Sequence, residues 1–163
     1  MSNRAVEQQN FDAKDPFAGL ALVTKPVPKA EPGHVVVRIT LRPVNPTDLI
    51  SISSNGLRIP GSEGFGIVHE VGDGVTTVAK GQRVVPFVGR DRQKGEGGVR
   101  VAAWALRNSI AERSEEYSDK VSKLIEAKII LPRVGETYDL ADFQLAIKKS
   151  TEVGRGGKVF LTG

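Results

Sequence analysis

The sequence predicts a mainly β domain with some α-helix, an α+β fold built as a bent, partly open β-barrel with two or three flanking helices. The first observation is the stretch 59–86, where β-branched runs too short for helices alternate with six glycines that permit tight turns. The second is the stretch 34–41, HVVVRITL, which is the strongest strand pattern in the chain. The third is a pair of segments, 115–128 and 140–149, whose apolar residues recur at helical spacing.

The segments before and after the strand at 34–41 follow from local chemistry. The apolar run 17–23 leads into an extended loop, because the prolines at 26, 28 and 32 cannot donate to a sheet. Pro46 suits the first turn of a short helix and Asn45 its cap, so a capped helical turn is expected there. The polar, glycine-rich stretch 89–100 predicts a loop.

The C-terminal part predicts a strand over 129–134 that is broken at Pro132, and a last strand that ends near Leu161. Asp139 near the start of the second helix, and Lys148 near its end, complement the helix dipole. One core is expected to unite both halves of the chain. Its predicted members are Val35, Val37, Ile39, Ile67, Val84, Leu124, Phe143 and Val159.

Composition limits the classes of function. A chain of 163 residues with 39% apolar and 26% charged residues suits one globular domain, and the absence of cysteine excludes disulfides, thiolate catalysis and cysteine zinc ligands. The net charge is +4, but basic and acidic residues are interleaved, so no nucleic acid partner is expected. There is no apolar run of about 20 residues and no visible signal or transit peptide, which predicts a cytoplasmic or mitochondrial matrix protein without membrane contact.

The glycine-rich stretch carries a resemblance. Its residues PGSEGFGIVHEVGDGV followed by GQRVV resemble the signature G-x-E-G-x-G-x-V, VG, GV and G-x-R-V of the medium-chain dehydrogenase/reductase superfamily, in its GroES-like catalytic domain. Zinc-dependent members have G-H-E where this chain has Gly61-Ser62-Glu63, so the chain looks most like the zinc-independent quinone oxidoreductases and mitochondrial-type enoyl thioester reductases. His34 and His69 lack a partner at metal-ligand spacing, so we expect no metal site.

The residues after Val99 resemble the C-terminal part of proteins of the same family. The segment AWALRN at 103–108 and the ending GRGGKVFL resemble the parts that flank the last helices of the enoyl reductases. The Rossmann cofactor domain that lies between these parts in the family is absent, because no glycine cluster has a strand, G-x-G-x-x-G and a helix in sequence. We therefore expect a single GroES-like domain over 1–163, built from 1–98 and 99–163 and joined by a loop at about 89–100.

The resemblance implies which residues line the site. The segment N-P-T-D puts Asn45 and Asp48 at the wall of the family's active site, and Ser53, Ser54 and Asn55 near the substrate mouth. Turns attract the same serine and asparagine residues, so a turn is the alternative role for them. Relatives carry a tyrosine shortly before the proline that leads into G-x-E-G, whereas residues 51–60 contain none. Tyr117 and Tyr138 are better explained by packing than as its substitutes.

The implied function is the substrate-side catalytic domain of an NADPH-dependent reductase of enoyl thioesters or quinones. NADPH is the cofactor of the intact family, and we expect this chain alone to bind no cofactor and to have little or no activity. The alternative is a non-enzymatic GroES-like binding or scaffold module, or a truncated variant that self-associates through the surface that the missing domain would cover.

Overall fold

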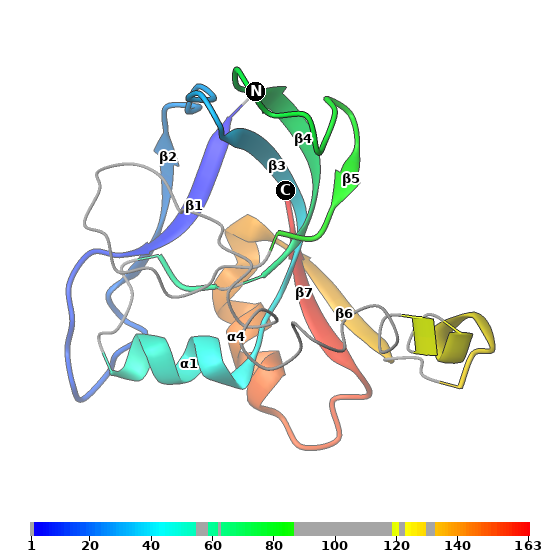
Figure 1. Cartoon of the computed structure of the whole chain (residues 1–163). Helices are drawn as coiled ribbons and strands as arrows, with labels where there is room; N and C mark the ends of the chain where they lie inside the picture. The colour runs from blue at the N-terminus through cyan, green and yellow to red at the C-terminus, as the bar shows by residue number, and fades with distance from the viewer. Residues whose placement is uncertain (1, 55–58, 62, 87–118, 121–122, 130–132) are drawn as a thin grey trace.

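A computed structural model describes residues 2–54, 59–61, 63–86, 119–120, 123–129 and 133–163. The strands of this part of the chain form two sheets (Figure 1). In the smaller sheet, β1 (Asn3–Gln8) pairs antiparallel with β2 (Leu20–Lys25). The strand β1 is formed although its sequence is mostly polar.

The larger sheet has five strands in the order β5-β4-β3-β7-β6. Its strands are β3 (Val35–Pro43), β4 (Phe65–Val71), β5 (Arg83–Val84), β6 (Val134–Asp139) and β7 (Lys158–Thr162). Neighbours pair antiparallel except β6 and β7, which are parallel. The pairing of β3 with β4 changes register twice, and Figure 1 shows β3 bending along its length.

The helices lie against one side of this arrangement. Helix α1 (Pro46–Ser53) follows β3 directly, and the single turn η1 (Leu140–Asp142) leads into α4 (Phe143–Thr151). Helix α4 contacts β6, β7 and α1, and η1 contacts β1. The mainly β fold with a few helices that the sequence predicts is confirmed.

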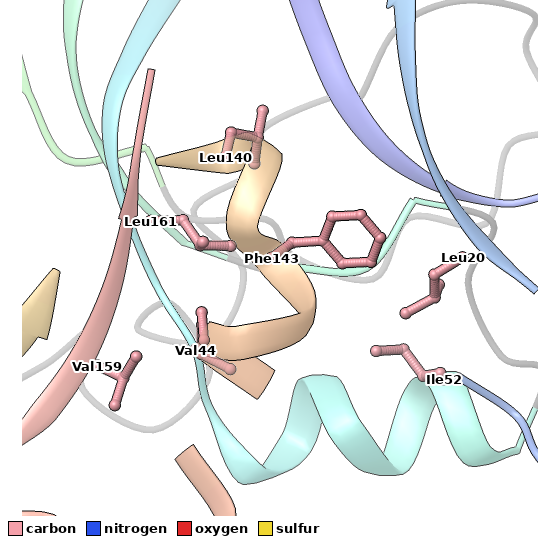
Figure 2. Packing of buried hydrophobic residues seen from close by; sticks show 8 residues of the cluster. Leu20, Val44, Ile52, Leu140, Phe143, Val159 and Leu161 are labelled. Carbon is pink, nitrogen blue, oxygen red and sulfur yellow. The ribbon is translucent and has the colours of Figure 1, made fainter. Parts of the chain in front are cut away.

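The core lies where α1, α4, β2 and β7 meet. Phe143 extends from α4 toward Leu20 of β2, and Ile52 of α1 lies on the same side (Figure 2). Phe143 and Val159 are buried as predicted, and the five predicted positions on β3, β4 and β5 are only half-buried. The full set of buried cluster residues is Leu20, Val44, Ile52, Leu140, Phe143, Ala146, Val159 and Leu161.

Two expectations about the C-terminal part are wrong. Leu124 is 36% exposed, because the core is filled from α1, η1 and α4 instead of the helical residues 123–126. Of the strand expected over 129–134, residues 130–132 lie outside the described residues, Ile129 and Arg133 are not in a strand, and β6 runs from Val134, opposite Lys158, to Asp139, opposite Thr162. Ile129 lies in a bend and is 71% exposed.

The two predicted helices and the predicted loop at 89–100 have different outcomes. Of the first predicted helix, residues 119–120 and 123–126 are helical. The second predicted helix is formed as α4. At the start of η1, which leads into α4, the Asp139 carboxylate accepts a hydrogen bond from the Ala141 N–H. The loop predicted at 89–100 lies outside the described residues. Within the described part of the chain, no helix combines the length and the apolar composition that a membrane crossing requires.

Candidate functional site

The start of α1 is fixed by a reciprocal cap. The backbone N–H of Asn45 donates to a carboxylate oxygen of Asp48 at 2.8 Å, and Pro46 occupies the first turn, where no N–H is needed. The capped helical turn that the sequence predicts is confirmed. Both Asn45 and Asp48 are buried, at 9% and 8% exposure, so they belong to the interior of the domain.

The side chain of Asn45 joins two charged residues from distant parts of the chain. Its amide nitrogen donates to the Glu63 carboxylate at 2.7 Å, and its amide oxygen accepts a hydrogen bond from the ammonium of Lys158. Glu63 lies two residues before the start of β4, and Lys158 is the first residue of β7. A neutral amide therefore bridges a carboxylate and an ammonium at the end of β3.

The environment of Asp48 favours its protonated form. Burial is the main cause, and it raises the pKa of this carboxyl above its ordinary value, with the nearby Glu63 charge acting in the same direction. The hydrogen bond from the Asn45 N–H and the positive charge of Lys158 oppose this shift without cancelling it. Asp48, Asn45, Glu63 and Lys158 thus form one electrostatically coupled cluster, which we call the α1 cluster.

An open hollow of about 210 Å³ lies beside the α1 cluster, and Glu63 and Lys158 belong to its lining. The remaining lining is mostly apolar, with Arg133 as a second cation. The lining residues are Pro43, Glu63, Gly64, Phe65, Val85, Arg133, Val134, Lys158 and Phe160. The hollow is therefore a place where a small ligand would meet both charge and apolar surface.

The glycine pattern that precedes and enters β4 has a packing cause. A Cβ on Gly66 would lie 2.5 Å from Cγ1 of Val37 and 2.7 Å from the carbonyl oxygen of Arg38. At Gly64 a Cβ would approach Ile39 and the Leu41 carbonyl oxygen at 3.0 and 3.2 Å. These glycines allow β4 to approach β3 closely, which brings Glu63 next to Asn45.

The other predicted site residues lie elsewhere. Ser53 and Ser54 are exposed at the far end of α1, which is about 12 Å long for its eight residues. The Ser54 hydroxyl donates to the Ser51 carbonyl oxygen at 3.3 Å, in keeping with the alternative turn role. Asn55 lies outside the described residues. The structure brings Asn45 and Asp48 together but does not bring Ser53 and Ser54 to them.

Sequence reasoning did not assign Glu63 and Lys158 to the site, although both stand in motifs that it used. Glu63 is the acidic residue of G-S-E-G, and Lys158 is the lysine of G-G-K-V near the end of the chain. No spacing links two residues 95 positions apart, so only the pairing of β3 with both β4 and β7 reveals their common partner, Asn45.

A second hollow, of about 270 Å³, lies on the outer side of α4 and holds Tyr138 and Lys149. Tyr138 donates to Glu136 at 2.5 Å, while the Lys149 ammonium lies 2.9 Å from both Glu136 and Glu152. These bonds lower the pKa of Glu136 and raise those of Tyr138 and Lys149. The Lys149 ammonium is thus shared between two carboxylates at the surface, and the Tyr138 hydroxyl is hydrogen-bonded within this group.

Metal-ligating residues do not gather in the described part of the chain. No group of three or more histidine, cysteine, aspartate or glutamate residues there has a geometry that could hold a metal ion. His34 is exposed and its Nδ1 lies 2.9 Å from the Pro32 carbonyl oxygen, whereas His69 is half-buried in β4. Ser62 lies outside the described residues.

The bent sheet with its helices, and the cluster at the start of α1, define a GroES-like catalytic domain of the kind found in alcohol dehydrogenases. The family described as "Alcohol dehydrogenase GroES-like domain" matches residues 31–112, which is half of the chain, and the chain belongs to this family. The match includes the α1 residues Asn45 and Asp48 as well as Glu63. The resemblance of the glycine-rich stretch to this family is thereby confirmed.

Solved structures support the fold. A cobalt- and zinc-bound thermostable alcohol dehydrogenase from Pyrobaculum aerophilum aligns over 100% of both chains with 16% identity and a TM-score of 0.68. The human synaptic vesicle membrane protein VAT-1 homolog-like protein aligns over 99% of this chain and 98% of its own, with 14% identity and a TM-score of 0.71. At these identities the likeness concerns the fold alone.

A mycobacterial quinone oxidoreductase matches 53% of this chain and 27% of its own length, with 29% identity and a TM-score of 0.43. Comparison with curated proteins gave no match. The zinc-independent quinone and enoyl reductase branch stays a prediction.

Proposed function

We propose that this chain is the substrate-side catalytic domain of a zinc-independent, NADPH-dependent oxidoreductase that reduces enoyl thioesters or quinones, and that it is inactive without a cofactor domain. The observation that carries the proposal is the α1 cluster beside the open hollow, within a GroES-like catalytic domain. The absence of cysteine from the whole sequence supports the zinc-independent type.

The described residues do not fit a dinucleotide. A pyrophosphate needs glycines whose backbone is open at the N-terminus of a helix. A Cβ on Gly66 would instead lie 2.7 Å from the Arg38 carbonyl oxygen, and one on Gly157, which leads into the strand β7, would lie 2.6 Å from the Gly135 backbone nitrogen. We therefore derive no hydride-transfer step from this chain and assign NADPH to a second domain.

The residues of this chain would bind and orient the substrate. Asn45 and Asp48 do not themselves line the hollow, and Asn45 would act on the substrate through Glu63 and Lys158, which its side chain holds by hydrogen bonds. The ammonium of Lys158 has three N–H donors, and those that are not directed to Asn45 would orient a substrate carbonyl oxygen. The apolar body of the substrate would lie against Phe65 and Val134 in the hollow.

The test is turnover with and without a cofactor domain supplied as a separate polypeptide. The chain alone should bind no NADPH at micromolar concentration and should turn over neither a crotonyl thioester nor a quinone. Adding the nucleotide-binding domain of an enoyl reductase should produce turnover, and Asn45→Ala should remove it. Micromolar NADPH binding by the chain alone would contradict the need for a second domain, and no turnover in the mixture would contradict the catalytic role.

A non-enzymatic binding or scaffold module is a second candidate, which the exposed apolar side chains around the hollow favour. Phe65, Val85 and Val134 are 45%, 64% and 71% exposed, and contiguous apolar surface promotes association. Light scattering across a concentration series tests this candidate. A defined oligomer that Val134→Glu dissociates would support it, whereas a monomer at all concentrations would exclude it.

A further inference from the structure

The hollow beside the α1 cluster has one apolar side made of large, exposed side chains. Phe65 of β4, Val85 just after β5 and Val134 at the start of β6 come from three different strands or their ends, yet all line this one space. Their exposed fractions of 45%, 64% and 71% leave much apolar area in contact with water. A ligand that covers this area would gain free energy from its burial.

The charges of the described residues that line the same hollow do not balance. Arg133 and Lys158 are adjacent, since the Lys158 N–H donates to the Arg133 carbonyl oxygen at 2.8 Å, and they contribute two positive charges. Glu63 contributes one negative charge. Neither cation forms an ion pair with another described residue, and the ammonium of Lys158 is hydrogen-bonded to the neutral amide of Asn45.

We infer that this hollow binds a small organic monoanion, a carboxylate with a flat apolar body. The apolar body covers Phe65, Val85 and Val134, and the carboxylate lies toward Arg133 and Lys158, where the excess of one positive charge is matched by one negative charge. This inference goes beyond the proposed function, because binding of this kind requires neither a cofactor nor turnover.

The probes are 2-naphthoate and its neutral counterpart 2-naphthamide, which have the same apolar body. Each is titrated into the full chain and followed by shifts of backbone amide resonances. Naphthoate should move the resonances of Phe65, Val134 and Lys158, and should bind about threefold or more tightly than naphthamide. Equal affinity for the two probes, or no shift at these residues with naphthoate at millimolar concentration, would overturn the inference.

Substitutions of charged residues test how much charge contributes to the affinity for each probe, separately from the apolar surface. Arg133→Gln should weaken naphthoate binding about threefold or more and leave naphthamide unchanged, because an exposed charge contributes modestly. Glu63→Gln should act in the opposite direction and tighten naphthoate binding, since Glu63 is the one acidic residue among the described lining residues. The matched control is Arg155→Gln, an exposed arginine that does not line the hollow and that should change neither affinity.

Two results would contradict the role of these charges. One is equal weakening by Arg133→Gln and Arg155→Gln, and the other is parallel weakening of both probes by Arg133→Gln. Turnover in the presence of a cofactor domain is measured separately, so failure of anion binding is distinguished from failure of the proposed oxidoreductase function.

Discussion

Asn45 has two structural roles at the start of α1. Its backbone N–H binds Asp48, and its side chain holds Glu63 and Lys158, which come from segments before β4 and at the start of β7. The asparagine cap and the nearby aspartate could be predicted from the motif N-P-T-D. The partners of the side chain could not, because they depend on strands that pair over long separations in sequence.

Replacing Asn45 by alanine should destabilise the domain by about 1–3 kcal/mol, because it removes a buried amide and leaves the half-buried carboxylate of Glu63 and ammonium of Lys158 without this partner. Urea unfolding followed by circular dichroism measures this cost. The control is Ser54→Ala at the exposed end of the same helix, where we expect less than about 0.5 kcal/mol. Equal costs for the two variants would show that the amide bridge adds no stability.

The raised pKa of Asp48, caused mainly by burial, predicts a pH dependence of stability. The folded state holds the proton of the Asp48 carboxyl more tightly than the unfolded state does. The contribution of this group to stability is therefore present below its unfolded pKa and is lost as pH rises through its folded pKa. The free energy of unfolding of the native chain relative to Asp48→Asn should therefore decrease from about pH 3 to about pH 7. A difference that stays constant over this range would contradict the shift.

Among the elements, β3 and β4 set the geometry of the site. The β-branched run at 34–41 and the alternation of β-branched residues and glycines at 59–86 predicted both strands, and the structure forms them at Val35–Pro43 and Phe65–Val71. The pattern did not predict the structural reason for which each glycine is required. Gly66 is needed because the backbone of β3 lies against it, whereas Gly74 is needed for its positive φ of 79° in an open turn.

These two glycines should respond differently to substitution. Gly66→Ala should cost about 1–3 kcal/mol through overpacking against Val37 and Arg38. Gly74→Ala should cost about 1 kcal/mol because of its φ, and Gly74→Asn should recover part of that cost, since asparagine tolerates this conformation. Urea unfolding of the four variants, with Gly66→Asn included, tests this difference. Recovery of stability in Gly66→Asn relative to Gly66→Ala would contradict the packing explanation.

At the scale of the whole molecule, the last strand of the chain lies inside the sheet. β7 pairs with β3 on one side and with β6 on the other, and two of its residues, Val159 and Leu161, belong to the buried cluster. The division of the chain into 1–98 and 99–163 stays a prediction, but the described residues of the C-terminal part share one core with β2, Val44 and α1.

This arrangement predicts that β3 and β7 unfold together. Amides of Arg42 and Leu161, which are paired in the sheet, should exchange with solvent with the same free energy of opening and the same dependence on denaturant. Native-state hydrogen exchange followed by NMR measures both quantities. Loss of protection in β7 at a lower denaturant concentration than in β3 would show that the C-terminal strand opens independently.

The sequence by itself determined the fold class, the strands at β3 and β4, the capped helix α1 and the resemblance to the GroES-like family, because each depends on neighbouring residues and on turn chemistry. Only the tertiary structure decided that Glu63 and Lys158 meet at Asn45, and that Leu124 is left out of the core. The reason is physical: local patterns select an element, whereas the contacts of its side chains depend on which strands it meets, and those strands come from distant parts of the chain.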